Sequence, residues 1–564
     1  MTSNLSKSRK LLFTSAAAAI LVALITFTVF FPLVHNAFAA SWDDNANLID
    51  NPDYRGFTWP HLKWMWTNHL TEHYVPLTWM TFGLDYVLWK VNPYGYHLTN
   101  VFLHAVNAGL FCLLALAILR LRFRGADRAT LLIGAVAAAL FFGLHPLRVE
   151  SVAWVTERRD VLSGFFYILA VLAYLRRARE GASQRSQRIF YWTCFGLFVA
   201  SVLSKEIAVT FPVVLLILDF YPLERLGNAP GRWFGPAVRG IWLEKIPFFI
   251  VALADSAMTF YVAVQNHLPE SVARLGWLPR LAITVYGMAF YILKTVAPSG
   301  LSPLYPLNPY KTNPGGMPFL LSFSFVAIVT VAALALYRRD RWLLPTWLAY
   351  AVILLPVGGL IHNGNQIAAD RYTYLSCLGW AVLAGAAAVL CWRWARTSWI
   401  RMAALMLVAL GAFSALAWQT RQQLGFWRDS DSLWSRVVSI EPCAMAFTNQ
   451  GVAFAQEGDF LGAEQAYRRA VAMDPAYAFA HYDLALVLID QRKYDEGIQE
   501  CRIAKQLKPD LVGAYDAIGS ALRNQGKIEE AIAAYRLAVQ VDPKYTPARK
   551  NLESTLRLKE RLTP

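Results

Sequence analysis

The sequence predicts an all-α protein in which a polytopic helical membrane domain is followed by an α-solenoid. Two observations predict this division. Apolar runs long enough to cross ~30 Å of hydrocarbon recur from Leu11 to about Trp418 and then stop. Beyond position 441, small and aromatic residues instead recur at a spacing of 34 residues, which is typical of stacked helical hairpins.

Composition supports the membrane assignment. The chain is 56% apolar, contains 20 tryptophans and has a mean hydropathy of +0.35, well outside the soluble range. The net charge of +15 comes mostly from short Arg and Lys clusters between apolar runs, so membrane topology explains it better than a nucleic-acid partner does. The six cysteines show no CxxC or metal-ligand spacing, which argues against zinc and disulfide frameworks.

The first apolar run is expected to be an uncleaved transmembrane helix. It covers 24 residues from Leu11 to Val34 and follows a basic N-terminus, whereas the core of a signal peptide has about 7 to 15 residues. The segment Ala37-Phe38-Ala39 imitates a signal-peptidase site, so a cleaved leader is the alternative.

Positively charged loops mark the cytoplasmic side and place residues 35–95, the first long loop, outside. A consistent alternation requires Arg280 to Ala297 to be a re-entrant or membrane-surface helix, giving about eleven crossings and an extracytoplasmic C-terminus. With twelve crossings the tail would be cytoplasmic. We predict a membrane domain over 1–420, a linker over 421–440 and a soluble tail over 441–564.

The tail is predicted to hold three tetratricopeptide repeats. Three kinds of position recur 34 residues apart: a small residue early in each repeat, an aromatic residue or cysteine later, and a proline near the end. The matching sets are Gly451, Ala485 and Gly519; Tyr467, Cys501 and Tyr535; and Pro475, Pro509 and Pro543. A polar helix from Pro547 to Leu562 closes the array. Such arrays bind proteins along a concave face; a purely structural lid is the alternative.

Two adjacent carboxylates, Asp43 and Asp44, follow the first apolar run in a loop rich in Trp, Asn and Pro. Like charges side by side at the edge of a bilayer are costly unless something uses them. A solvated helix cap is the structural alternative. We interpret the pair as the candidate catalytic residues, in which the neighbouring charge raises the pKa of one carboxyl.

A polar stripe lies within an otherwise apolar helix. It consists of His97, Asn100, His104 and Asn107, at helical spacings of i, i+3, i+7 and i+10, so all four share one face. Such a stripe lines a cavity or pairs with another helix. We favour cavity lining.

Charged residues recur near the predicted outer ends of later helices. The short loop from His145 to Asp160 contains three arginines, against the positive-inside bias. A guanidinium binds phosphate oxygens bidentately, so a lipid phosphate is the favoured partner. Local salt bridges, or snorkelling of lone cations, are the alternatives. The residues singled out are His145, Arg148, Glu150, Arg158, Asp160, Lys205, Glu206, Lys294, Arg371 and Tyr374.

As a set, these motifs resemble the transmembrane and tetratricopeptide-repeat-containing O-mannosyltransferases and their bacterial relatives, which are GT-C-type glycosyltransferases. The segments that carry the resemblance are Trp42-Asp43-Asp44-Asn45, Asn51-Pro52, Tyr74-x-Pro76-Leu77-Thr78, His97-x-x-Asn100-x-x-x-His104, His145-Pro146, Arg158-x-Asp160, Ser204-Lys205-Glu206 and Arg371-x-x-Tyr374-Leu375. This chain has Ser376 where family members usually carry proline, and Val75 where many carry arginine.

The resemblance implies a polyprenyl- or dolichyl-phosphate-linked sugar as donor, with mannose favoured, and a protein hydroxyl as acceptor. It implies that Asp43 is the general base and that Asp44 positions the acceptor. Cations hold the donor phosphate, and a second set of residues surrounds the sugar. The first set is Arg148, Arg158, Lys205, Lys294 and Arg371; the second is His97, Asn100, His104, His145, Glu150, Asp160, Glu206 and Tyr374.

Further expectations concern setting and partners. We expect a bacterial cytoplasmic membrane, with the site and the repeats on the extracytoplasmic side and the repeats binding the acceptor protein. A divalent metal is not supported, because no further acidic ligand accompanies the aspartate pair at a convincing spacing. The competing hypotheses are a membrane-anchored repeat scaffold, a transporter, and a transferase that acts on a glycan or lipid acceptor.

Overall fold

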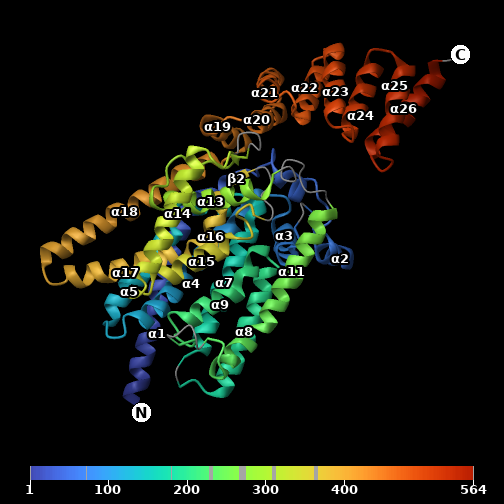
Figure 1. The fold of residues 1–564 in the computed structure, drawn as a ribbon. Helices are drawn as coiled ribbons and strands as arrows, with labels where there is room; N and C mark the ends of the chain where they lie inside the picture. Colours follow the sequence, from blue (N-terminus) through green and yellow to red (C-terminus); the bar gives the residue numbers. More distant parts are fainter. Residues whose placement is uncertain are drawn as a thin grey trace. The chain divides into compact units, whose positions relative to one another are not determined.

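The structure is a computed structural model that describes residues 2–70, 73–179, 181–227, 233–265, 275–307, 313–360 and 366–562. The chain forms two compact units (Figure 1). The first consists of Met1–Ala39 with Asp43–Arg428, and the second of Ala40–Trp42 with Asp429–Pro564.

The first unit is helical except for one small two-stranded sheet. Strand β1 (Tyr305–Pro306) pairs antiparallel with β2 (Gln366–Ala368). The helices are α1 (Thr2–Phe30), α2 (Trp59–Thr67), α3 (Pro76–Trp89), α4 (Pro93–Arg122), α5 (Arg128–Gly143), α6 (Val149–Ala153), α7 (Arg158–Arg177), α8 (Gln184–Val202), α9 (Phe211–Phe220), α10 (Arg239–Leu243), α11 (Ile246–Gln265), α13 (Trp277–Val296), α14 (Met317–Leu336), α15 (Leu343–Leu354), α16 (Thr373–Ser376), α17 (Leu378–Ala395) and α18 (Trp399–Phe426).

Fewer helices than expected are long and apolar enough to cross a membrane. Within the described residues five qualify, or six if the bent pair Arg128–Gly143 and Pro146–Ala153 counts as one span. The expectation of about eleven crossings is therefore not met. Several apolar runs form helices that are too short, such as α9 with 10 residues and α15 with 12. Others carry charge at their ends, as α7 does with arginines in its first and last turns. The predicted re-entrant segment forms one continuous helix, α13.

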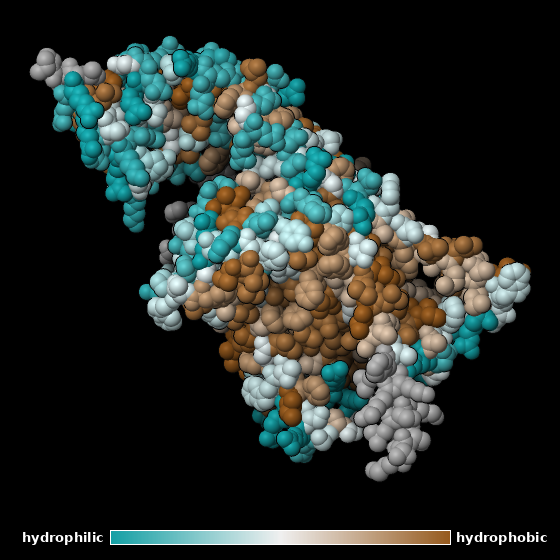
Figure 2. All heavy atoms as spheres, turned by 180° about the vertical axis from the view of Figure 1, so that it is seen from behind, coloured by the Kyte–Doolittle hydropathy of each residue, from teal (hydrophilic) through white to brown (hydrophobic). Residues whose placement is uncertain are grey.

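On the face seen in Figure 2, apolar residues cover the middle of the first unit, and hydrophilic residues lie beyond them. Inside, α4 is the central helix, which packs against α1, α5 and α7. Its start is set by Asn92, whose side chain accepts a hydrogen bond from the Tyr94 amide, with Pro93 at the first helical position; both are typical helix-start signals.

Small residues allow α5 and α17 to approach closely. A Cβ atom on Gly385 of α17 would lie 2.5 Å from the carbonyl oxygen of Gly134 on α5. Only hydrogen fits there, which is how membrane helices commonly bring their backbones together.

The second unit is a solenoid of paired helices. Its elements are α19 (Ser430–Ile440), α20 (Ala444–Gln456), α21 (Phe460–Met473), α22 (Ala478–Asp490), α23 (Tyr494–Leu507), α24 (Val512–Asn524), α25 (Ile528–Val541) and α26 (Thr546–Leu562). The predicted three helix pairs and the terminal helix are confirmed. The small and aromatic positions pack against each other within one repeat: a Cβ on Gly451 would lie 2.5 Å from the ring of Tyr467, and one on Gly519 would lie 2.6 Å from the ring of Tyr535.

The predicted linker over 421–440 is not an extended connection. Its first residues complete α18, and residues 430–440 form α19, which packs on α20. Asp429 caps α19 by accepting a hydrogen bond from the Ser432 amide, which is a local signal for a helix start.

Candidate active site

The two adjacent aspartates have different surroundings. Asp44 is buried, and its carboxylate accepts three hydrogen bonds: from the Ala39 amide at 2.9 Å, the Thr156 amide at 3.0 Å and the Thr156 hydroxyl at 2.6 Å. Asp43 is partly exposed and has no hydrogen-bond or ion-pair partner among the residues that the structure describes. Asp44 therefore ties the loop to the turn at Thr156, and Asp43 is left available.

Both carboxyls have a raised pKa, chiefly because of burial. Burial raises the pKa of Asp44 to about 6 despite its three hydrogen bonds. The pKa of Asp43 is raised by burial and by the charge of Glu157, while Arg159, Arg371 and His73 act to lower it. The predicted mutual repulsion is a minor cause, since for Asp44 the charge of Asp43 ranks last among the causes.

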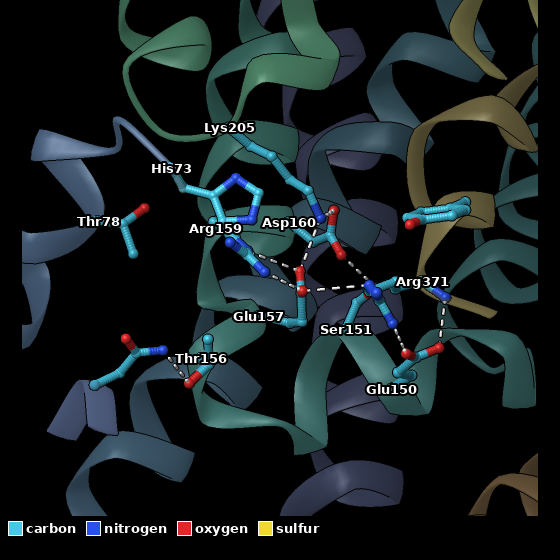
Figure 3. A network of polar contacts seen from close by, with 12 residues as sticks. His73, Thr78, Glu150, Ser151, Thr156, Glu157, Arg159, Asp160, Lys205 and Arg371 are labelled. Atoms are coloured by element: carbon cyan, nitrogen blue, oxygen red, sulfur yellow. Dashed lines mark hydrogen bonds and ion pairs between the residues drawn. The ribbon is translucent and has the colours of Figure 1, made fainter. Parts of the chain in front are cut away.

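A buried carboxylate, Glu157, contacts three cations (Figure 3). Arg159 binds it through two nitrogens, at 3.2 Å and 2.6 Å. The Lys205 ammonium lies 2.7 Å from the same carboxylate, and Arg371 Nε lies 3.3 Å away. Burial alone would raise the pKa of Glu157, but these three cations hold it well below its usual range.

Two further carboxylates, Glu150 and Asp160, bind two of these cations. Glu150 pairs with the Arg371 guanidinium and accepts a hydrogen bond from the Arg371 amide at 2.8 Å. Asp160 lies 2.7 Å from the Lys205 ammonium, and its other oxygen accepts a hydrogen bond from the Ser151 hydroxyl at 3.0 Å. Each cation is thereby held in one geometry before any ligand arrives.

The residues of this network come from distant parts of the chain but from similar local structures. Each lies at the end of a helix or in a short turn: Asp43 precedes the π-turn Asn45–Ile49, Glu157 ends the 3₁₀ turn Val155–Glu157, Arg159 opens α7, Lys205 precedes the 3₁₀ turn Glu206–Thr210, and Arg371 lies in the 3₁₀ turn Asp370–Tyr372. Helix ends can present side chains and free backbone groups to a ligand.

Arg148 differs from the other cations. It is 2% exposed and lies over the rings of Phe142 and Tyr374 at 5.2 Å and 5.9 Å. Its Nε and Nη1 atoms have no hydrogen-bond partner within the part of the chain that the structure describes, and no carboxylate there forms an ion pair with it. A buried guanidinium with free donors is suited to an anionic ligand.

The tetratricopeptide repeat family matches residues 420–478, 448–512 and 512–545. The chain is 26% identical to the protein O-mannosyl-transferase Tmtc3 of Drosophila melanogaster over 535 residues, which cover 83% of this chain and 56% of that protein. It is 24% identical to the protein O-mannosyl-transferase TMTC4 of Homo sapiens over 499 residues, which cover 80% of this chain and 61% of the relative.

The predicted resemblance is confirmed. The chain thus spans between half and two thirds of the length of these two O-mannosyl-transferases. A higher identity of 32% to the Xenopus laevis protein O-mannosyl-transferase tmtc2 covers only 33% of this chain and 22% of that protein. Among solved structures, the second tetratricopeptide domain of human RPAP3 in complex with an HSP70 peptide covers 20% of this chain, with 26% identity and a TM-score of 0.19.

Arg158 does not face the Glu157 network. The Asp85 carboxylate lies 2.5 Å from its Nη1, Asn100 accepts a hydrogen bond from its Nε at 2.7 Å, and the Tyr96 carbonyl accepts one from its Nη2 at 2.8 Å. Because every nitrogen has a protein partner, the structure does not support its assignment to the donor phosphate. Arg158 instead joins α7 to α3 and α4.

The polar stripe of α4 connects helices and does not line a cavity. Asn100 donates to the Val152 carbonyl at 3.0 Å, and Asn107 donates to the Val161 carbonyl at 2.7 Å. His104 Nδ1 lies 3.0 Å from the Tyr374 hydroxyl, and His97 Nε2 lies 3.2 Å from the Ala37 carbonyl. All these side chains are buried, so the preferred interpretation of cavity lining is corrected to interhelical bonding.

The remaining predicted residues have partners outside the Glu157 network. His145 Nε2 is 3.0 Å from the Thr295 carbonyl, and Lys294 donates to the Ser299 carbonyl at 2.5 Å. These contacts are with backbone oxygens of neighbouring segments. Glu206 is partly buried and lies 2.8 Å from His73 Nδ1, a contact that holds the pKa of Glu206 at about 2 although burial acts to raise it.

Sequence reasoning did not single out Glu157, Arg159, His73 or Thr156 as site residues. Arg159 stands beside Arg158, and only the direction in which α7 begins decides which of the two faces Glu157. His73 lies in an irregular loop with no periodic signal. Among the described residues, no group of three His, Cys, Asp or Glu side chains is placed to hold a metal ion.

Proposed function

We propose that this chain is a membrane glycosyltransferase that moves a sugar, mannose in the first instance, from a polyprenyl-phosphate carrier to a serine or threonine hydroxyl of an exported protein. One observation carries the proposal. Asp43 is a carboxylate without a partner among the described residues, yet it lies within the field of Arg159 and Arg371. A base beside fixed cations is what transfer from a phosphate leaving group requires.

The reaction is an inverting displacement. The acceptor oxygen forms a bond to the anomeric carbon, and the bond between that carbon and the phosphate oxygen breaks. The phosphate leaves with the electron pair, while Asp43 takes the proton of the acceptor hydroxyl. A phosphate is a good leaving group, so no general acid is needed. The raised pKa of Asp43 makes its carboxylate a stronger base than an exposed aspartate.

The cations have two roles in this proposal. Arg148 offers the donor phosphate its unpaired Nε and Nη1 donors. Arg159, Lys205 and Arg371 are held by Glu150, Glu157 and Asp160 and present fixed positive charge where the leaving group becomes more negative. A single preorganised contact of this kind contributes about 3 to 4 kcal/mol to transition-state stabilisation.

The relatives support the choice of reaction, since their names specify protein O-mannosyl transfer. We further propose that the site faces the extracytoplasmic side of a bacterial cytoplasmic membrane and that the repeats bind the acceptor protein. A repeat scaffold needs only an anchor, and an anchor does not need a buried network of three carboxylates and three cations.

Mass spectrometry of cells with and without this chain tests the proposal. We expect hexose-modified serine or threonine peptides from exported proteins to be lost when the chain is absent and to return when it is restored. Loss of sugar from a glycan or a lipid, with the protein hydroxyls unchanged, would assign a different acceptor. No change in any glycosylated product would refute the transferase.

A further inference from the structure

A basic groove lies at the C-terminal end of the solenoid, between α24 and α26. Its volume is about 440 Å³, and its charged lining comprises Arg523, Lys550, Glu553, Arg557 and Arg561. Four cations thus face one carboxylate. Ser554 and Leu558 complete the wall, and the Leu558 side chain is 38% exposed.

The groove lies where the first helices of the last two units meet. Arg523 and Arg557 are 34 residues apart, so they hold equivalent positions on these helices. The first helices of successive units contact one another along the solenoid. The two earlier units carry Ala455 and Ile489 at the same position, so the positive charge is confined to this end.

Local ion pairs leave most of this positive charge uncompensated. Glu553 pairs with Arg557 at 2.5 Å, and Arg523 donates to the neutral Ser554 hydroxyl at 3.3 Å. Lys550 and Arg561 have no ion-pair partner in the described part of the chain. Elsewhere in the unit, opposite charges balance, as where Glu464 and Glu496 contact Arg468 and Lys493. A cap that served only solubility would mix the two signs.

We propose that this groove binds an acidic, extended segment of a partner protein. Guanidinium groups bind carboxylates bidentately, and Leu558 can pack against an apolar residue between them. From Lys550 to Arg561 the wall runs for about 16 Å along α26, which is the length of about five extended residues. A lipid headgroup is shorter than this.

This inference rests on the proposed function in one respect: the acceptor protein is taken as the source of the acidic segment. Binding itself does not require sugar transfer, so the two ideas can fail separately. If the groove binds acidic peptide but no sugar is transferred, the proposed function fails and this inference stands.

The test uses the full-length protein in nanodiscs of zwitterionic lipid and a fluorescent peptide of about ten residues that alternates Glu, Asp and Leu. We expect saturable binding by anisotropy, and no binding of the matched Gln, Asn and Leu peptide. The double variants Lys550→Glu with Arg561→Glu, and Lys550→Gln with Arg561→Gln, should weaken binding by about tenfold or more. The matched control is Lys527→Glu with Lys544→Glu, two exposed lysines outside the groove, which should bind as wild type does.

Three results would overturn the inference. The first is equal binding of the acidic and amide peptides. The second is an equal loss in the groove and control variants, since that would reflect net charge alone. The third is binding of the protein to vesicles of anionic lipid that requires Lys550 and Arg561 and that the acidic peptide does not inhibit. That result would assign the groove to the membrane surface.

Discussion

At the scale of residues, the site contains two pairs of identical neighbours with different surroundings. Asp44 and Arg158 form hydrogen bonds and ion pairs that join separate segments of the protein. Their neighbours in the chain differ: Asp43 has no partner among the described residues, and Arg159 binds the buried carboxylate of Glu157. Residue type alone therefore does not distinguish a structural from a chemical role here; the direction of the side chain does.

The aspartate pair allows a matched test of stability. Asp44→Ala removes the acceptor of the Ala39 amide and of two Thr156 donors. We expect the free energy of unfolding to fall by about 2 kcal/mol. The loss of three hydrogen bonds destabilises the protein, and the variant no longer has to bury a carboxylate, which offsets part of that loss. Asp43→Ala should leave the unfolding midpoint in detergent unchanged. Equal midpoints for both variants would contradict the structural role of Asp44.

Substitutions of the two adjacent arginines, Arg158 and Arg159, should affect different properties, the stability of the fold and the rate of sugar transfer. Arg158→Gln leaves Asp85 buried without its cation and should cost about 3 to 5 kcal/mol of stability. Arg159→Gln keeps Lys205 and Arg371 on Glu157, so the protein should fold, while sugar transfer falls by about 100-fold or more. Thermal unfolding and the initial rate of transfer measure the two effects. A stable Arg158→Gln protein that is inactive would restore Arg158 to the donor site.

At the scale of elements, α4 determines how the membrane unit is held together. Its polar stripe reaches the backbone of α6 and α7 and the side chain of Tyr374 on α16. This arrangement explains how a helix of 30 residues carries two histidines and two asparagines inside an apolar unit. The helices are assembled through these bonds as well as through close packing.

Tyr374→Phe tests that interpretation. The substitution keeps the ring under Arg148 but removes the hydroxyl that contacts His104 at 3.0 Å and Asn107 at 2.9 Å. We expect about 1 to 3 kcal/mol less stability, with the rate of transfer at low temperature close to that of wild type. A large loss of rate with no change in unfolding temperature would instead indicate that the stripe contacts the substrate.

Several elements were predictable from the sequence, and the reasons are local. The repeats follow from the 34-residue spacing of Gly451, Tyr467 and their equivalents, because small and aromatic positions pack against each other within one repeat. Lys205 and Arg371, which stood out in the sequence as charges at helix ends, both contact Glu157. The roles of Arg158 and the α4 stripe were not predictable, because they depend on which distant backbone oxygen each side chain meets. The predicted number of membrane crossings was wrong for a related reason, because neighbouring helices can cover helices that are charged or short.

At the scale of the whole molecule, each unit carries its own chemistry. The first holds the carboxylates and cations, and the second holds a solenoid with a basic groove. Deleting residues 441–564 should lower transfer to the natural acceptor protein by about tenfold or more, while hydrolysis of the lipid-linked donor persists. Release of free sugar and incorporation into protein measure the two reactions. If both fall together, the repeats stabilise the first unit and do not recruit the acceptor.

The proposed transfer depends most directly on the proton-accepting role of Asp43. The decisive measurement is the rate of sugar transfer from a polyprenyl-phosphate donor to the acceptor protein by purified wild type and Asp43→Asn. We predict that the variant folds with an unchanged unfolding temperature, retains donor binding and loses transfer by about 100-fold or more. Transfer by the folded variant at the wild-type rate would contradict the account, because the carboxylate left unpaired among the site cations would then have no part in the reaction.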